Sequence, residues 1–152
     1  MVQVQNILWL TDFSQDSAYA LAYAHTLAGL YKTKLCLMHV IENPTSRIYG
    51  PVEGDYLAME RNAREKAETW LREYTTKELR DFPNHEILLR EGDILAEILR
   101  VETEKAIGTI VVSTHGRTGL AHMLLGSVAE KVVRSVHCPV YVIRHPERLT
   151  TR

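Results

Sequence analysis

Five short segments of the chain are rich in β-branched and other apolar residues, which is typical of strands buried on both faces of a sheet. These segments are Val4–Leu10, Lys34–Ile41, His85–Arg90, Thr109–Val112 and Val140–Ile143. Between them, apolar residues recur every three or four positions and predict four helices. The first helix is expected to be capped by Ser14 or Asp16 and to continue to Ala28. The others are expected from Tyr56 to Arg80, Ile94 to Thr103 and Val128 to His137.

Two of these helices have an apolar stripe that can be assigned residue by residue. In the first helix the stripe is expected at Ala18, Leu21, Ala22, His25 and Ala28. In the long second helix it is expected at Ala63, Ala67, Trp70, Leu71 and Tyr74. The strict alternation of strands and helices predicts an α/β fold, with a parallel sheet covered by helices on both faces and joined by right-handed crossovers.

Ligands of such sheets bind at the carboxyl ends of the strands, where the strand order reverses. Two loops carry suitable residues there. The loop after the first strand contains Thr11 and Asp12, and the loop after the fourth strand contains the glycines Gly116, Gly119 and Gly126. If the first and fourth strands are neighbours, an acid and an anion-binding loop face each other, as a nucleotide requires.

The glycine loop has the composition of an anion site. No Asp or Glu occurs from Lys105 to Ala129, although 19 of the 152 residues are acidic. Glycine N–H groups and a helix N-terminus both favour a bound phosphate. Ser127 and Glu130 form an S-x-x-E pattern, which predicts a capping box at the start of the fourth helix. An ordinary strand-to-helix connection that needs glycines for its turns is the equally weighted alternative.

Composition limits the remaining possibilities. A chain of 152 residues is expected to form a single domain over residues 1–152. The formal net charge of −1 gives no indication of nucleic acid or a membrane surface as partner, and neither a signal peptide nor a membrane span is evident, so a cytoplasmic protein is expected. Cys36 and Cys138 are interpreted as small buried residues without a disulfide.

Four pieces of the sequence in register resemble the universal stress protein family. They are Thr11-Asp12-Phe13-Ser14, His39-Val40, Gly92-Asp93 and the stretch Thr109–Ser127. The resemblance covers roughly Val4 to Arg144. It implies a Rossmann-like, five-stranded parallel sheet in the order 3-2-1-4-5, which makes the first and fourth strands neighbours.

Members of this family that bind ATP share a G-x2-G-x9-G-(S/T) motif, and the matching positions here are Ser113, Gly116, Gly126 and Ser127. Serine therefore replaces the first glycine. The resemblance implies that Gly116, Gly126 and Ser127 hold phosphates, that Asp12 lies near the adenosine end and that the Val40 backbone meets adenine. The full set of implied ATP contacts is Leu10, Thr11, Asp12, Val40, Ser113, Gly116, Arg117, Gly126, Ser127 and Val128. A Mg²⁺ ion could bridge the phosphates.

Each candidate residue also has a purely structural interpretation. Asp12 could cap the first helix or close an Asx turn. Ser127 could be an N-cap, which would compete with phosphate for the same hydroxyl. His39 is expected to be a core or rim histidine rather than a base, whereas His115 and Arg117 could screen phosphate charge.

Three functional hypotheses follow. The first is an ATP-binding, nucleotide-responsive regulator that is not an enzyme in the usual sense, with occupancy ordering the Asn43–Gly54 loop. The second is a slow ATPase or kinase-like activity in which Asp12 orients water. The third is an interaction dimer without nucleotide, which Ser113 favours. A homodimer through the last strand, Val140, Tyr141, Val142 and Ile143, is expected because this apolar strand would lie at the sheet edge.

Overall fold

The computed structural model describes residues 4–42, 53–116 and 125–149 of the chain. Strands and helices alternate along these residues, as the hydrophobic pattern predicts. The elements are β1 (Asn6–Leu10), α1 (Gln15–Tyr31), β2 (Leu35–Ile41), α2 (Glu53–Glu78), β3 (His85–Glu91), α3 (Ile94–Glu104), β4 (Ile107–Ser113), α4 (Ser127–Ser135), β5 (Val140–Ile143) and a 3-10 helix (Pro146–Leu149).

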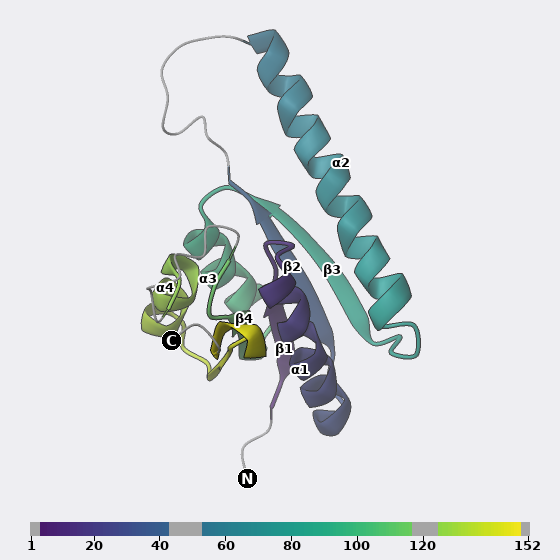
Figure 1. The fold of residues 1–152 in the computed structure, drawn as a ribbon, viewed down its shortest axis with the longest axis vertical. Coiled ribbons are helices and arrows are strands. Elements are labelled where there is room, and N and C mark those ends of the chain that lie inside the picture. Colours follow the sequence, from purple (N-terminus) through teal and green to yellow (C-terminus); the bar gives the residue numbers. More distant parts are fainter. Residues whose placement is uncertain (1–3, 43–52, 117–124, 150–152) are drawn as a thin grey trace.

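The five strands form one parallel sheet in the order β3-β2-β1-β4-β5, so the predicted fold class and strand order are confirmed. Figure 1 shows α1 and α2 on one side of this sheet and α3 and α4 on the other. The central strand β1 pairs with both β2 and β4, and Trp9 lies opposite Leu37 and Val111. The loops that follow β1 and β4 therefore leave the sheet side by side.

Alternate residues of β1 point to opposite faces of the sheet, as the pleat of a strand requires. Ile7 and Trp9 pack with α1 and α2, and Leu8 and Leu10 pack with α3 and α4. All four side chains are buried. Because both faces are covered, the strand reads as a continuous apolar run, which is why it was recognisable in the sequence.

The buried face of α1 differs from the predicted stripe. Ala20, Leu21, Ala24 and Ala28 are buried, together with Asp16 and Ser17. Ala22 is exposed, and Ala18 and His25 are only half-buried. Alanine occurs on every side of this helix, so the contrast between its faces was too small to orient it from sequence. Of the two candidate caps, Ser14 is the one used, because its side chain accepts a hydrogen bond from Ser17 N, and Asp16 lies in the first turn.

The apolar face of α2 is also narrower than predicted. Ala67 and Leu71 are buried, but Ala63 is exposed and Trp70 keeps 39% of its surface accessible. Figure 1 shows that the N-terminal part of this long helix extends past the end of the sheet. Within the described part of the chain, no helix combines the length and apolar character needed to cross a membrane.

The two cysteines agree with their interpretation as small apolar residues. Both are free thiols, with Cys36 buried and Cys138 half-buried. Burial raises the pKa of Cys36 to about 11. Burial, with a smaller contribution from the Glu102 carboxylate, raises the pKa of Cys138 to about 12. Both thiols are therefore protonated and unreactive near neutral pH.

Candidate functional site

The loop after β1 is closed by two side-chain hydrogen bonds within four residues. Thr11 Oγ1 accepts from Phe13 N at 2.9 Å and also shares a hydrogen bond with Ser17 Oγ. Asp12 Oδ1 accepts from Ser14 N at 3.0 Å, which is the Asx turn anticipated as the structural role of Asp12. Only Oδ1 accepts a hydrogen bond within this turn, and Oδ2 lies toward Gly116.

The loop after β4 begins with a turn that uses the Ser113 hydroxyl. Ser113 Oγ donates to His115 O at 2.9 Å, and Ser113 is buried. Its φ is not positive, since Phe13, Lys32 and Ala106 are the positive-φ residues other than glycine in the described ranges. Serine at the first motif position is therefore accommodated without backbone strain. Because the hydroxyl donates its proton to His115 O, the predicted ligand contact of Ser113 would use the hydroxyl as an acceptor or the backbone, and it stays a prediction.

The two ends of this loop come together at Gly126. Gly126 N donates to Thr114 O at 2.6 Å. A Cβ atom on Gly126 would lie 3.0 Å from the same carbonyl oxygen, so a larger residue would push the two ends apart. The φ of Gly126 is −71°, which any residue can adopt. Glycine is thus required here by the close approach of two backbones and not by conformation.

The predicted capping box at the start of α4 is wrong. Gly126 is the N-cap residue, no side chain of the described residues caps the helix, and Ser127 is its first residue. Gly126 O accepts from Glu130 N, while the Glu130 carboxylate pairs with Arg134 at 3.1 Å. The Gly126 carbonyl accepts the first hydrogen bond of the helix, so Gly126 has the N-cap position that was predicted for Ser127. The exposed Ser127 hydroxyl and the first amides of α4 are consequently not committed to a side-chain cap.

Asp12 and Gly116 bring the two loops into contact. A Cβ atom on Gly116 would lie only 2.5 Å from Asp12 Oδ2, which is too close for two nonbonded atoms. The φ of Gly116 is outside the left-handed region, so the constraint is the space taken by the carboxylate. The expectation that an acid and the glycine loop face each other is therefore confirmed in geometry.

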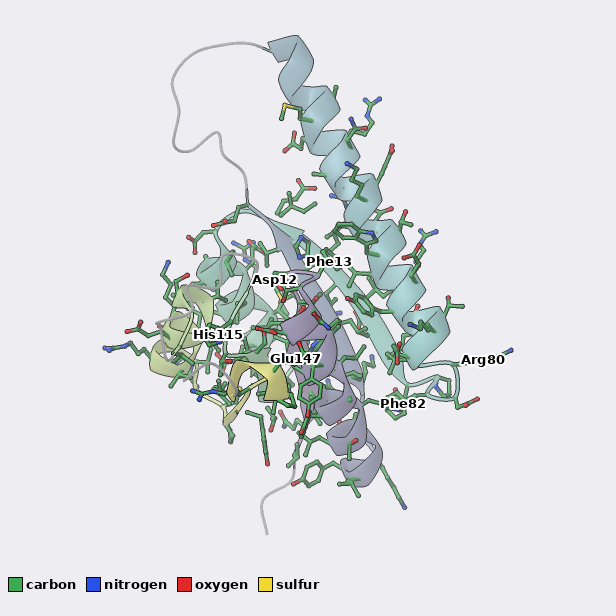
Figure 2. All side chains as sticks on the ribbon, in the orientation of Figure 1. Asp12, Phe13, Arg80, Phe82, His115 and Glu147 are labelled. Atoms are coloured by element: carbon green, nitrogen blue, oxygen red, sulfur yellow. The ribbon has the colours of Figure 1, made fainter. Side chains whose placement is uncertain are left out.

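Aromatic side chains lie on the other side of Asp12, and sequence reasoning did not assign them to the site. The Phe13 ring lies 4.4 Å from the His39 ring and 4.8 Å from Trp70 of α2, measured between centroids. Figure 2 shows Phe13 at the end of β1 toward α2, with His115 on the opposite side of Asp12. The sequence signal that could have identified Phe13 is its place as an aromatic residue among polar ones in the loop Thr11-Asp12-Phe13-Ser14.

Histidine 39 has the rim position expected of it. Its Nδ1 donates to Thr11 O at 2.8 Å, because a carbonyl oxygen can only accept. The ring thus ties the end of β2 to the end of β1. Nearby, burial and the negative charges of Asp12 and Glu78 raise the pKa of Tyr74 above its ordinary value. Tyr74 therefore remains a neutral phenol beside the Asp12 carboxylate.

The other predicted ligand residues lie around these loops. Leu10 is buried beneath them, and Val40 and Val128 are half-buried against the same core cluster. Arg117 lies outside the described residues, as does 43–52 of the predicted Asn43–Gly54 loop. His115 is buried and its Nδ1 shares a hydrogen bond of 2.8 Å with Thr114 Oγ1, so it is part of the loop's internal structure.

Comparison with known proteins identifies the family. The sequence pattern of the universal stress protein family matches residues 3–144. The chain belongs to the universal stress protein family. Universal stress protein MJ0531 of Methanocaldococcus jannaschii is 30% identical over 139 residues, which cover 91% of this chain and 81% of that protein.

Solved universal stress proteins share the fold. The structure of MJ0577 from the same archaeon superposes with a TM-score of 0.83 at 28% identity, covering 95% of this chain and 98% of that one. A universal stress protein solved in complex with cAMP superposes with a TM-score of 0.59 at 22% identity, covering 93% of this chain and 98% of that one. The predicted family is therefore confirmed.

The contact between Asp12 and Gly116 predicts a specific coupling between two substitutions. Gly116→Ala should destabilise the protein by about 1–3 kcal/mol, because the new methyl group displaces the Asp12 carboxylate. In an Asp12→Ala background the same substitution should cost clearly less. Urea unfolding of the four proteins in this cycle measures the difference. Equal costs in both backgrounds would show that the carboxylate does not occupy the space beside Gly116.

Proposed function

We propose that this universal stress protein binds ATP at the carboxyl ends of β1 and β4 and acts as a nucleotide-responsive regulator. The observation that carries the proposal is the contact of Asp12 with Gly116, which joins an acceptor and an anion-binding loop into one site. Support also comes from the sequence motif formed by Gly116, Gly126 and Ser127, and from a family member of the same fold that was solved with cAMP.

The anion-binding half of the site is the start of α4. No side chain in the described part of the chain caps its first amides, and the helix dipole favours negative charge there. Gly126 holds Ser127 close to the end of β4 through its bond to Thr114 O. Phosphate oxygens would accept from these amides and from the exposed Ser127 hydroxyl.

The other half of the site is an acceptor surface for the nucleoside. Asp12 Oδ1 accepts from Ser14 N, and Oδ2 lies on the side of Gly116, where a ribose hydroxyl would donate to the carboxylate. Val40 lies at the end of β2, beside β1, where its backbone can meet the base. Hydrogen bonds to charged groups contribute about 1.5–3 kcal/mol each, so three or four of them support micromolar affinity.

A dimer without nucleotide is the second candidate function. Ser113 favours it, because its hydroxyl closes a turn within the protein where nucleotide-binding relatives have glycine. The edge strand β5 also favours self-association, since Tyr141 is 42% exposed on a strand that pairs with β4 alone in the described sheet. Dimerisation is compatible with both candidates, and only nucleotide binding separates them.

Nucleotide binding can be tested with a matched pair of glycine variants. The wild-type protein should release heat on titration with ATP and should melt at a higher temperature in millimolar ATP. Gly126→Ala should weaken binding about tenfold or more, because its methyl group presses on Thr114 O and moves the α4 N-terminus. Gly29→Ala, at a position with open space, is the control and should bind normally. Absence of heat and of a thermal shift in the wild type would favour the non-nucleotide dimer.

We expect bound ATP to be hydrolysed slowly or not at all. A cradle of backbone amides stabilises the ground state and the transition state alike, and such uniform binding does not raise turnover. Asp12 is held in an Asx turn and His115 is bonded to Thr114, so neither is poised as a base. Steady-state assays with Mg²⁺ should give turnover far below about 1 per second. A faster rate that disappears in His115→Ala, with ATP affinity retained, would establish an enzyme.

The dimer through β5 can be tested by sedimentation. The wild-type protein should sediment at twice the 17.4 kDa mass of one chain at micromolar concentration. Tyr141→Glu should shift it toward monomer, because the carboxylate would be buried in the paired edge. Val133→Glu on α4, where valine is 48% exposed, is the control and should leave the dimer intact. Equal weakening of the dimer by both variants would place the interface elsewhere. A wild-type protein that sediments as a monomer would exclude the dimer.

A further inference from the structure

Phe13 has a backbone conformation that aromatic residues rarely adopt. Its φ is 63°, in the left-handed region favoured by glycine, asparagine and aspartate. Such a conformation persists only where surrounding contacts impose it, and it tends to mark functional sites. Phe13 also directly follows Asp12, the residue that joins the two loops. The contacts that hold Phe13 therefore also determine where the Asp12 carboxylate lies.

Those contacts come from elements other than the two loops of the site. The Phe13 ring lies 4.4 Å from His39 at the end of β2. On α2 it meets Trp70 edge-on, at 4.8 Å and 64°, and lies parallel to Tyr74 at 6.4 Å. Edge-to-face and offset contacts at these separations are attractive beyond the burial of apolar surface. Three rings on two elements thus surround one residue of the β1 loop.

The turn itself transmits the position of the ring to the carboxylate. Phe13 N donates to Thr11 Oγ1 on one side of Asp12, and Ser14 N donates to Asp12 Oδ1 on the other. With the ring fixed, the chain on both sides of Asp12 is fixed, and Oδ2 is directed at Gly116. A different position of Phe13 would break these bonds and release the carboxylate.

We propose that Phe13 is a positioning residue for the nucleotide site, and that its ring, docked between His39 and Trp70, holds Asp12 against Gly116. Helix α2 thereby shapes the affinity of the site through Trp70, which is 39% exposed and accessible to a partner. By linkage, whatever displaces Trp70 weakens nucleotide binding, and bound nucleotide favours the docked Trp70. The positioning of Asp12 stands by itself, whereas its effect on affinity rests on the proposed function.

The first experiment requires no nucleotide. Gly116→Ala lowers the melting temperature only while Asp12 is held beside it, so its effect reports the position of the carboxylate. In Phe13→Gly, which keeps the left-handed turn accessible but removes the ring, the shift caused by Gly116→Ala should fall by at least half. Phe13→Tyr retains a ring and should preserve the full shift.

Phe13→Leu is the substitute if the glycine variant does not fold. It should behave as Phe13→Gly does, because it fills space without offering a ring. If Gly116→Ala causes the same shift in Phe13→Gly, or in its substitute Phe13→Leu, as in Phe13→Tyr and the wild type, the ring does not position Asp12. The proposal is then overturned.

The second experiment measures ATP affinity by titration calorimetry. Trp70→Ala should weaken binding about tenfold, since losing the Asp12 contact removes one charge-assisted hydrogen bond. Met59→Ala is the control on the same helix, because Met59 is 71% exposed, and its affinity should match that of the wild type. In an Asp12→Ala background, Trp70→Ala should have no further effect.

The outcomes separate the two proposals. Wild-type affinity in Trp70→Ala, or equal losses with and without Asp12, would overturn the coupling of α2 to the site while leaving nucleotide binding intact. A wild-type protein that does not bind ATP would overturn the proposed function, and the melting-temperature experiment would then decide the positioning of Asp12 alone.

Discussion

The contact between the Asp12 carboxylate and Gly116 is the constraint on which the candidate site depends. Strand order brings β1 and β4 together, and within the described residues this contact joins their two loops. It requires a glycine at residue 116 because there is no room for a side chain. It also requires a held carboxylate, which the Asx turn with Ser14 and the docked ring of Phe13 provide. A ligand that bridges the loops would exploit a geometry that the protein has already built.

The glycines of the motif illustrate how structural and functional roles coincide. Gly126 is needed because its backbone closely approaches Thr114 O, and Gly116 because of Asp12. Neither has a positive φ, so conformational freedom does not explain them. Both close approaches shape the same loop, which leads directly to the start of α4, where Gly126 is the N-cap. The glycines that serve the packing of the loop therefore also lead to the amides that the proposed phosphate site would use.

Much of the fold was predictable because a parallel sheet covered on both faces leaves a strong apolar signal in each strand. The boundaries of β5 agree residue for residue with the prediction from Val140 to Ile143. The face of α1 was not predictable, since alanines surround that helix. The capping box failed because a glycine carbonyl, invisible in a pattern of side chains, begins α4 one residue earlier. Phe13 was missed because its role depends on rings from β2 and α2, which only the tertiary structure brings to it.

A titration of the ¹⁵N-labelled protein with ATP, followed by amide resonances, tests the central claim that the two loops form one site. The amides of Asp12 in the β1 loop and of Gly116, Gly126 and Ser127 in the β4 loop should shift together, along one binding curve. Shifts confined to a single loop, different affinities for the two loops, or no shift at millimolar ATP would contradict the claim.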